Sequence, residues 1–314
     1  MANNAPNHAA NFRHEVVTAQ SQRQEIAFKK ILEPALYLVA TPIGNLGDFS
    51  PRGAQTLNNC DLVLAEDTRV TKRLMRLHGI KGRVIRCDEA ATELGLQAAL
   101  QVLYAGGAVT FCCDAGTPGV SDPGERLARG VIDAGFQVRA IPGASAALAA
   151  LTVSGLPSKQ FFFAGFAPAK ASARAAFFHE CATIPASLIF YETGPRLQES
   201  LAAMLKIFGN RMACVARELT KLYEETRRGS LEELVNTYAK ASSPRGEIVV
   251  VVAGASHDQA ITHAAEVNDL LKEALTRLSV KDAAAAIAFQ TGLSRKDVYG
   301  RALALIATTR SAKP

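Results

Sequence analysis

The sequence predicts an α/β protein with two α/β domains and a small helical segment toward its C-terminal end. Short apolar runs of strand length alternate with stretches whose apolar residues recur at helical spacing, from about residue 36 to residue 252. In the first part of the chain, up to about residue 141, such alternation favours a mostly parallel sheet that is covered by helices. After residue 268 the helical spacing continues without a strand-like run, and a length of 314 residues suits about two domains.

The first α/β domain is expected over residues 35–155. Ser50 followed by Pro51 is typical of a helix N-cap and the first helical residue. Asp122 and Glu125, with a proline between them, are typical of a capping box at the start of a later helix. The strands of this domain are expected at residues 36–40, 61–65, 83–86, 108–113 and 136–141.

The second α/β domain is expected over residues 156–256, with helical stretches such as residues 195–208 between its strands. Two α/β units of similar size with one junction predict a cleft between them. Residues 1–34 are polar, lack the apolar core of a signal peptide and are expected to form a flexible extension. The strands of the second domain are expected at residues 161–165, 187–191, 213–217 and 248–252.

The C-terminal segment, residues 268–314, has the pattern of a helix-turn-helix. Residues 279–282 and 294–297 both have the form Ser-x-x-Asp, which is typical of a capped helix start. A turn with a glycine, residues 291–293, lies between the two predicted helices. The pattern equally fits a plain helical hairpin that packs on the rest of the protein, and the spacing alone does not decide between them.

The composition is that of a folded protein, with 48% apolar and 20% charged residues. No apolar run reaches the roughly 18 residues that a membrane-spanning helix needs. The six cysteines are scattered and form neither a CxxC pair nor a zinc pattern, so we expect free thiols in a cytoplasmic protein without a metal site. A net charge of +6 is compatible with a polyanionic partner but does not require one.

The most informative segment is the loop at residues 114–124, which follows the apolar run 108–113. It contains three glycines and two prolines, so its backbone shape is strongly specified. Open α/β sheets bind ligands at the carboxyl ends of their strands, and this loop is at such an end. The chain contains no GxxxxGK[ST], GxGxxG, HExxH or GxSxG, which argues against P-loop, dinucleotide, zincin and serine-hydrolase sites. The alternative is that residues 114–124 are an ordinary connection between a strand and a helix, but such connections are usually shorter than this loop.

Acidic residues also follow several of the predicted strands. If the strands are parallel, these residues gather at one edge of each sheet and can form a site there. For Asp67 and Thr68 the alternative is a helix N-cap, and one residue can serve as both. The acidic residues at strand ends are Glu66, Asp67, Asp114, Glu192 and Glu218.

Seven blocks of the sequence resemble, in order and spacing, those of the ribosomal RNA small subunit methyltransferase I family, within the tetrapyrrole-methylase-like group. The sequence departs from the family's pattern at residues 86–91, where relatives often carry a His- and Asn-containing stretch, and just after Glu192. The matching blocks are residues 38–48, 65–69, 114–124, 142–146, 190–193 with Arg196 and Leu197, 216–221, and the C-terminal hairpin.

The resemblance implies a fold of the tetrapyrrole methylase type, with S-adenosylmethionine in the cleft between the two domains, and a homodimer. It also implies 2′-O-methylation of a cytidine ribose in the decoding region of 16S rRNA, with that RNA or the small ribosomal subunit as the partner. The residues implied to bind the cofactor are Pro42, Asp114, Ala115, Gly116, Ser121, Asp122, Ser145, Ala146, Tyr191 and Leu219.

Methyl transfer from a sulfonium is an in-line displacement, so the protein mainly has to position two reactants. The ribose hydroxyl is a weak nucleophile and must lose a proton, and Glu66 and Asp67 are the candidate general bases. Arg69 is a candidate to hold a phosphate. The alternative is that no side chain acts as the base and water takes the proton late. The residues of the C-terminal segment expected to contact RNA are Arg295, Lys296 and Arg301.

Two other functions stay open at this point. One is a methyltransferase of the same superfamily that acts on a small tetrapyrrole, although the block at residues 66–69 and the C-terminal hairpin argue against it. The other is a transcription regulator without enzymatic activity, in which an α/β sensor domain binds an effector and the helix-turn-helix binds DNA.

Overall fold

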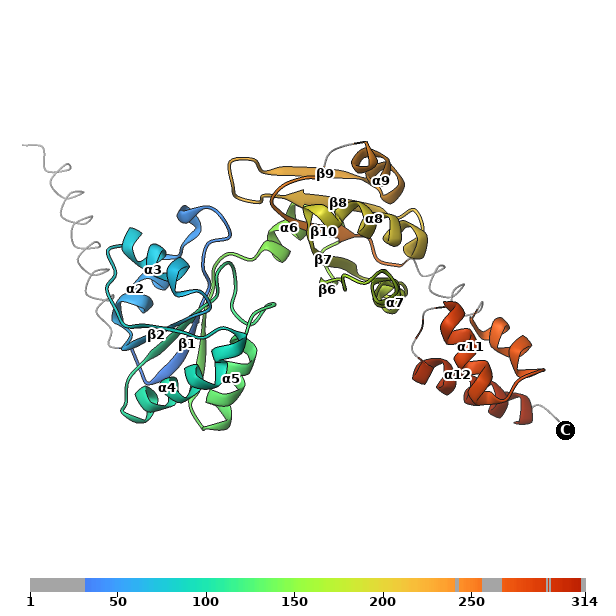
Figure 1. Cartoon of the computed structure of the whole chain (residues 1–314), viewed down its shortest axis with the longest axis horizontal. Helices are drawn as coiled ribbons and strands as arrows, with labels where there is room; N and C mark the ends of the chain where they lie inside the picture. Colours follow the sequence, from blue (N-terminus) through green and yellow to red (C-terminus); the bar gives the residue numbers. More distant parts are fainter. Residues whose placement is uncertain (1–31, 241–242, 256–266, 292, 294, 312–314) are drawn as a thin grey trace, which may run out of the picture. The chain divides into compact units, whose positions relative to one another are not determined.

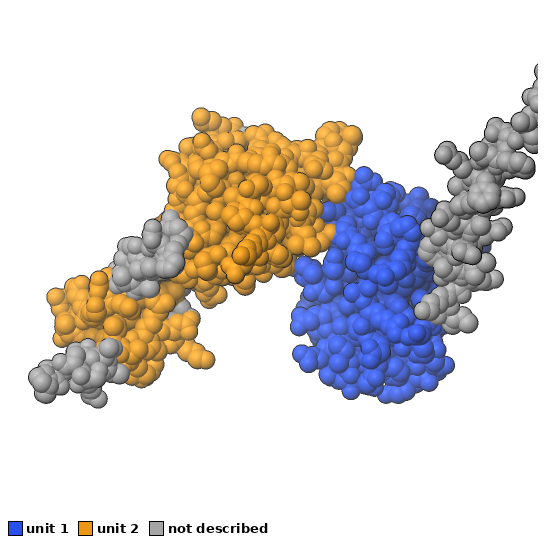
Figure 2. Space-filling model, turned by 180° about the vertical axis from the view of Figure 1, so that it is seen from behind, with its two compact units in different colours: residues 1–144 blue, residues 145–314 orange. Residues whose placement is uncertain are grey.

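The computed structural model describes residues 32–240, 243–255, 267–291, 293 and 295–311 (Figure 1). The chain divides into two compact units, residues 1–144 and 145–314, which are blue and orange in Figure 2. The predicted N-terminal extension lies almost entirely outside the described residues. No described helix is both long enough and apolar enough to cross a membrane.

The first unit contains a five-stranded parallel sheet in the order β3-β2-β4-β1-β5. All five strands predicted for this part of the chain are present. The strands are β1 (Ala35–Val39), β2 (Leu62–Ala65), β3 (Val84–Arg86), β4 (Val109–Cys112) and β5 (Gln137–Ile141), with helices α2 (Pro51–Asn59), α3 (Thr68–Leu77), α4 (Thr92–Tyr104) and α5 (Gly124–Asp133) and the short 3-10 helices η1 (Leu46–Asp48) and η2 (Glu89–Ala91).

The inner strands of this sheet are buried on both faces. Neighbouring residues of a strand point to opposite faces, so they belong to different cores. Tyr37 belongs to a core that includes Leu57 of α2 and Leu74 of α3. Leu36, its neighbour in β1, belongs to a second core that includes Leu103 of α4 and Leu127 of α5. Helices therefore cover both sides of the sheet and leave the carboxyl ends of the strands as the open edge.

The helix starts in this unit agree with the sequence at α2 and differ at α5. Ser50 caps α2 and accepts a hydrogen bond from the Gly53 N–H at 3.0 Å, as predicted. The capping box predicted for Asp122 was wrong, because the N-cap of α5 is Pro123. The Asp122 carboxylate instead folds back on its own loop, as described below.

The second unit contains a mixed sheet in the order β6-β7-β10-β8-β9, in which only β6 and β7 are parallel. Helix α6 packs on β10 and β8, whereas α7, α8 and α9 cover the other face around Phe178, Leu201 and Leu234. The elements are α6 (Ala146–Ser154), β6 (Phe161–Phe166), α7 (Ala171–Cys181), β7 (Ser187–Thr193), α8 (Gly194–Phe208), β8 (Met212–Arg217), β9 (Glu225–Ser230), α9 (Leu231–Ala239) and β10 (Glu247–Val252).

The second sheet differs from the first in the direction of its strands and contains one strand that the sequence analysis did not predict. The sequence analysis missed β9, whose polar sequence ETRRGS shows no alternation of apolar residues. This strand lies at the edge of the sheet and pairs only with β8, so it needs few apolar side chains. Because β7 and β8 are both antiparallel to β10, they run in the same direction and their carboxyl ends share one edge.

The boundary between the units lies between Ala144 and Ser145, whereas the sequence analysis placed it after residue 155. Helix α6 accounts for the difference, because it packs on β10, β8 and β7 of the second sheet. Arg228 of β9 also donates a hydrogen bond from Nε to the carbonyl oxygen of Val153 in α6, at 2.9 Å. The helix is thus part of the second unit.

The C-terminal residues form α11 (Val280–Thr291) and α12 (Arg295–Ser311), which pack together around Ile287 and Val298. The predicted cap at the start of α11 is confirmed, since the Asp282 N–H donates to Ser279 Oγ at 3.2 Å. The second predicted cap and the glycine of the turn fall on residues 294 and 292, which lie outside the described residues.

The six cysteines are all unpaired. Five of them are buried and Cys60 is half-buried, which confirms the prediction of free thiols. Burial raises the pKa of Cys87 and of Cys181 to about 11, with a smaller contribution from a neighbouring carboxylate in each case. These thiols are therefore protonated at neutral pH and behave as small apolar side chains.

Candidate functional site

Three loops at the carboxyl edge of the first sheet are tied to one another by hydrogen bonds. Thr41, which follows β1, exchanges backbone hydrogen bonds with Gly116 at 2.9 and 3.1 Å. The Thr117 hydroxyl donates to the carbonyl oxygen of Ala144 at 3.0 Å. Since Ala144 follows β5, the loops after β4, β1 and β5 form one connected edge, and β4, β1 and β5 are neighbours in the sheet.

The glycine-rich loop has a fixed and partly strained backbone. The Asp122 carboxylate accepts hydrogen bonds from the N–H groups of Gly119 and Gly124, at 2.9 and 2.7 Å, and so closes the loop on itself. Ser121 has a φ of 68°, which is uncommon for a residue with a side chain and is typical of functional loops. A Cβ atom added at Gly124 would lie 2.8 Å from the Gly119 nitrogen, so the two backbones can approach only because Gly124 is a glycine.

The loops after β2 and β4 exchange hydrogen bonds through their carboxylates. The Asp114 N–H donates to Glu66 Oε2 at 3.1 Å, and the Asp67 N–H donates to Asp114 Oδ1 at 3.0 Å. The two strands are neighbours in the parallel sheet. The sequence prediction that Glu66, Asp67 and Asp114 gather at one sheet edge is therefore confirmed.

Two of these carboxyl groups are harder to ionise than usual. Burial raises the pKa of Glu66, and the nearby charges of Asp114 and Asp122 add to this effect. Burial also raises the pKa of Asp114, with a further contribution from the charge of Asp67. Each of the two accepts a backbone N–H, which opposes the shift without cancelling it.

Asp67 has the opposite environment. Hydrogen bonds from the side chain and backbone of Arg69 lower its pKa to about 2. Asp67 is the N-cap of α3 and accepts from the Arg69 N–H at 2.8 Å, and it also pairs with the Arg69 guanidinium at 2.6 Å. The N-cap alternative is therefore confirmed for Asp67. The Arg69 side chain is 89% exposed despite this ion pair, so its guanidinium can still reach a phosphate.

In the second unit, two neighbouring residues near the end of β7 make different contacts: Tyr191 packs on aromatic rings, and Glu192 makes buried polar contacts. Tyr191 packs edge-to-face on Phe163 and Phe166 of β6, with ring centroids 4.9 and 5.4 Å apart. Glu192 is only 3% exposed and accepts from the Ser200 hydroxyl at 2.5 Å, and Arg196 Nε lies 3.4 Å from it. Glu192 thus joins β7 to α8, and the sequence analysis missed the partner Ser200, which has no motif of its own.

The turn after β8 is strained around the predicted cofactor residue Leu219. The residues on either side of it, Glu218 and Thr220, have φ values of 51° and 65°. Lys221 Nζ bonds to Glu218 Oε1 at 2.8 Å and to Glu247 Oε2 at 3.0 Å. Burial opposes the charge of Lys221, but these hydrogen bonds and charges raise its pKa overall. The ion pairs hold the turn against the start of β10, which leaves Leu219 7% exposed.

The predicted cofactor residues divide between the two units, each of which is described by itself, so the predicted cleft stays a prediction. The first unit contains Pro42, Asp114, Ala115, Gly116, Ser121 and Asp122, and the second contains Ser145, Ala146, Tyr191 and Leu219. Ser145 is the N-cap of α6, with the Leu148 N–H at 3.5 Å from its hydroxyl.

Among the described residues there is no cluster of three or more His, Cys, Asp or Glu side chains that could hold a metal ion.

The basic residues predicted to contact RNA lie on α12. Arg295 and Lys296, in the first turn of the helix, are exposed, and Arg301 is half-buried. Val298 and Ala302 of the same helix are buried against α11 and the helical residues before it. The structure therefore gives α12 one packed face and an exposed N-terminal turn with two positive side chains.

The fold and the two sheet edges define the chain as a tetrapyrrole methylase in architecture. The family model described as Tetrapyrrole (Corrin/Porphyrin) Methylases matches residues 35–235. A crystal structure of uroporphyrin-III-C-methyltransferase from Thermus thermophilus is similar with a TM-score of 0.51 at 20% sequence identity, over 69% of this chain and 94% of that one. The predicted fold class, two α/β domains and a C-terminal helical segment, is thus confirmed.

The ribosomal RNA small subunit methyltransferase I of Mesorhizobium japonicum is 47% identical over 278 residues, which cover 87% of this chain and 93% of that protein. The protein of the same name from Erythrobacter litoralis is 47% identical over 274 residues, or 87% of this chain and 96% of that protein. A second family model, described as RsmI C-terminal HTH domain, matches residues 262–306. The chain belongs to the ribosomal RNA small subunit methyltransferase I family, and its C-terminal hairpin is the helix-turn-helix of that family.

Proposed function

We propose that this chain is a methyltransferase that uses S-adenosylmethionine to methylate the ribose 2′-hydroxyl of a cytidine in the decoding region of 16S rRNA. The hydrogen-bonded junction of Glu66, Asp67 and Asp114 carries the proposal, because it sets a candidate base beside the strained glycine-rich loop. The names of the relatives, which specify methylation of the small subunit RNA, support the same class of substrate.

The residues present fit S-adenosylmethionine, which when bound supplies the methyl group and a strong leaving group. The strained backbone at Ser121 and the tight approach at Gly124 give the first unit a preformed loop that a flexible connection would not provide. In this proposal Pro42 and the residues of that loop, Asp114 to Asp122, bind the cofactor from the first unit. From the second unit, the cofactor contacts are Ser145, Ala146, Tyr191 and Leu219.

Glu66 is the better candidate for the general base of the two acidic residues. Its raised pKa makes its carboxylate a stronger base than an ordinary glutamate, whereas the lowered pKa of Asp67 makes that group a weak one. Glu66 would accept the proton of the ribose hydroxyl as the oxygen attacks. Asp67 instead fixes the Arg69 guanidinium, which binds a phosphate of the RNA beside the reacting ribose.

The remaining parts of the proposal concern the partners. We propose that the helix-turn-helix, through Arg295, Lys296 and Arg301, contacts the phosphates of 16S rRNA or of the small ribosomal subunit. We also propose that the enzyme is a cytoplasmic homodimer that requires neither a metal ion nor a membrane.

One labelling experiment tests the reaction against its alternatives. The protein is incubated with methyl-labelled S-adenosylmethionine and, in separate reactions, with a tetrapyrrole or with small ribosomal subunits that lack the modification. The RNA is then digested to nucleosides. We expect the label on the ribose of a cytidine. Label on a base would refute ribose methylation, and label on a tetrapyrrole but not on RNA would favour the small-molecule methyltransferase. The absence of label on either substrate would favour the regulator.

A further inference from the structure

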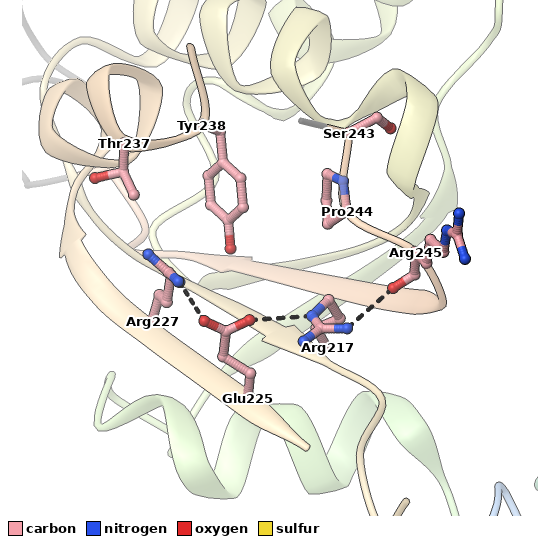
Figure 3. Close-up of a pocket in the computed structure, with 8 residues that line it drawn as sticks. All are labelled: Arg217, Glu225, Arg227, Thr237, Tyr238, Ser243, Pro244 and Arg245. Atoms are coloured by element: carbon pink, nitrogen blue, oxygen red, sulfur yellow. Dashed lines mark hydrogen bonds and ion pairs between the residues drawn. The ribbon is translucent and has the colours of Figure 1, made fainter. Parts of the chain in front are cut away.

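A cavity of about 460 Å³ lies in the second unit, and none of its lining residues is a predicted cofactor residue (Figure 3). Its floor is formed by β8 and β9, and one wall is α9, while the segment before β10 forms the other wall. This volume is within the range of small-molecule sites. The lining residues are Arg217, Glu225, Arg227, Thr237, Tyr238, Ser243, Pro244 and Arg245.

A single carboxylate holds two of the arginines in place. Glu225 accepts from Arg227 Nε at 2.5 Å and from Arg217 Nε at 3.0 Å, and Arg217 also donates to the carbonyl oxygen of Arg245 at 3.2 Å (Figure 3). Burial opposes the charge of Glu225, but the two arginines outweigh it and lower the pKa of the group. The guanidinium groups of Arg217 and Arg227 thus lie at the cavity with one ionised carboxylate, which leaves an excess of positive charge.

The Arg227 guanidinium keeps donors available for a ligand. Its Nε atom is bonded to Glu225, whereas its two terminal nitrogens have no hydrogen bond to any residue that the structure describes. The guanidinium carbon lies 5.8 Å from the centre of the Tyr238 ring, so its position is restrained on that side as well. A fixed guanidinium with free terminal N–H groups suits the oxygens of a phosphate.

The Tyr238 hydroxyl is a buried polar group at the cavity. Tyr238 extends from α9 toward Glu225 and Arg227 and is only 7% exposed (Figure 3). Its buried hydroxyl has no hydrogen-bond partner among the described residues, which is unfavourable unless a bound group satisfies it. Burial raises the pKa of this hydroxyl, so it is a neutral donor at ordinary pH.

We propose that this cavity binds a phosphate group, with Arg227 and Arg217 as charged donors and the Tyr238 hydroxyl as a neutral donor. The Tyr238 ring and Pro244 provide apolar walls beside the charged floor, which suits a phosphate that is attached to a nucleoside. The phosphate can belong to the RNA strand or to a free nucleotide. The RNA source rests on the proposed function, and the free source does not.

The first test is the binding of inorganic pyrophosphate to the full chain, measured by isothermal titration calorimetry at low salt. We expect one site, weakened about tenfold by Arg227→Gln and about tenfold by Tyr238→Phe, since each removes a hydrogen bond to a charged ligand. Lys206→Gln removes the same charge from an exposed position on α8 and should bind like the wild type. Without pyrophosphate, Tyr238→Phe should unfold at the wild-type temperature or above, because it loses only an unpartnered hydroxyl.

No binding by the wild type would overturn the proposal, as would equal weakening by Lys206→Gln and Arg227→Gln. A 16S rRNA fragment then identifies the source of the phosphate. If Arg227→Gln lowers the slope of log affinity against log salt by about 0.7 to 0.9, the phosphate belongs to the RNA. If only pyrophosphate binding changes, the ligand is a free phosphate compound. Wild-type protein that binds pyrophosphate but transfers no methyl group would refute the proposed function and leave this site intact.

Discussion

Two adjacent acidic residues, Glu66 and Asp67, have opposite environments at the same sheet edge. Both residues are half-buried, but Glu66 lies near other carboxylates and its burial raises its pKa, whereas hydrogen bonds from Arg69 lower the pKa of Asp67 to about 2. The environment therefore distinguishes the proposed base, Glu66, from the proposed positioning residue, Asp67, although the sequence alone offered both as candidate bases.

We expect Glu66→Gln to lower the turnover number for methyl transfer by about a hundredfold or more, because a general base typically contributes that much. The affinity for S-adenosylmethionine, measured separately by calorimetry, should change by less than about threefold. Asp67→Asn is the matched variant, and its main effect should be a higher KM for RNA, since Arg69 loses its anchor. Wild-type turnover in Glu66→Gln would show that no side chain at this position takes the proton.

The low pKa of Asp67 also predicts a dependence of stability on pH. A carboxylate whose pKa falls from about 3.8 in the unfolded chain to about 2 in the folded protein stabilises the fold above the unfolded value. This contribution is lost as the pH falls through the folded value. The difference in urea midpoint between the wild type and Asp67→Asn should therefore be constant from pH 7 to pH 5 and shrink below about pH 4. A difference that grew on acidification would contradict the Asp67–Arg69 pair.

At the scale of single elements, the turn after β8 depends on a close approach of two segments. Gly246 has a φ of 98°, and a Cβ atom added there would lie 2.4 Å from the Glu218 Cδ atom. Glu218 in turn accepts from the Glu247 N–H at 3.0 Å and from Lys221. The shape of the turn that holds Leu219 therefore depends on a glycine outside the turn itself.

We expect Gly246→Ala to lower the free energy of unfolding by at least about 2 kcal/mol, because it adds a steric conflict to an unfavourable φ. Gly79→Ala is the control, since Gly79 has a φ of 67° but no atom within 4 Å of the added Cβ. Gly79→Ala should lower the free energy of unfolding by only about 1 kcal/mol. Urea denaturation measures both, and equal losses in the two variants would show that contact with Glu218 is unimportant.

The helix-turn-helix carries the three basic residues that we propose to contact RNA. Replacement of Arg295, Lys296 and Arg301 by glutamine should reduce the slope of log affinity for 16S rRNA against log salt by about 2, if each residue contacts one phosphate. Binding of S-adenosylmethionine should not change, because the predicted cofactor residues lie outside this segment. Filter binding at several salt concentrations measures the slope, and an unchanged slope would remove α12 from the RNA interface.

At the scale of the whole molecule, the resemblance to the family predicts a homodimer. With a chain mass of 33.4 kDa, the particle in solution should have about twice that mass. Light scattering coupled to size exclusion measures this mass directly, over a range of protein concentrations. A mass of a single chain at every concentration would contradict the dimer.

The fold was predicted well where secondary structure has an apolar signature. The inner strands of the first sheet, β1, β2 and β4, are buried on both faces and appear in the sequence as apolar runs such as residues 108–113. Strand β9 has no such signature, because an edge strand with polar residues on both faces looks like a loop in the sequence. The predicted boundary, after residue 155, differs from the observed one, after Ala144, because the apolar sequence of α6 does not specify which of the two sheets the helix covers.

The candidate site was predictable to a smaller extent. The meeting of Glu66, Asp67 and Asp114 followed from their positions at the ends of parallel strands. Their different pKa values did not, because these depend on burial and on the Arg69 side chain, which the sequence does not locate. The cavity around Tyr238 was also missed, since it depends on β9 and on a segment far along the chain.

The close approach of Gly246 and Glu218 couples two positions that are 28 residues apart in the chain. A side chain at position 246 would displace the Glu218 carboxylate, because its Cβ atom would lie 2.4 Å from Glu218 Cδ. That displacement would disturb the ion pair between Glu218 and Lys221. A single substitution outside the turn would thus reach the lysine on its far side.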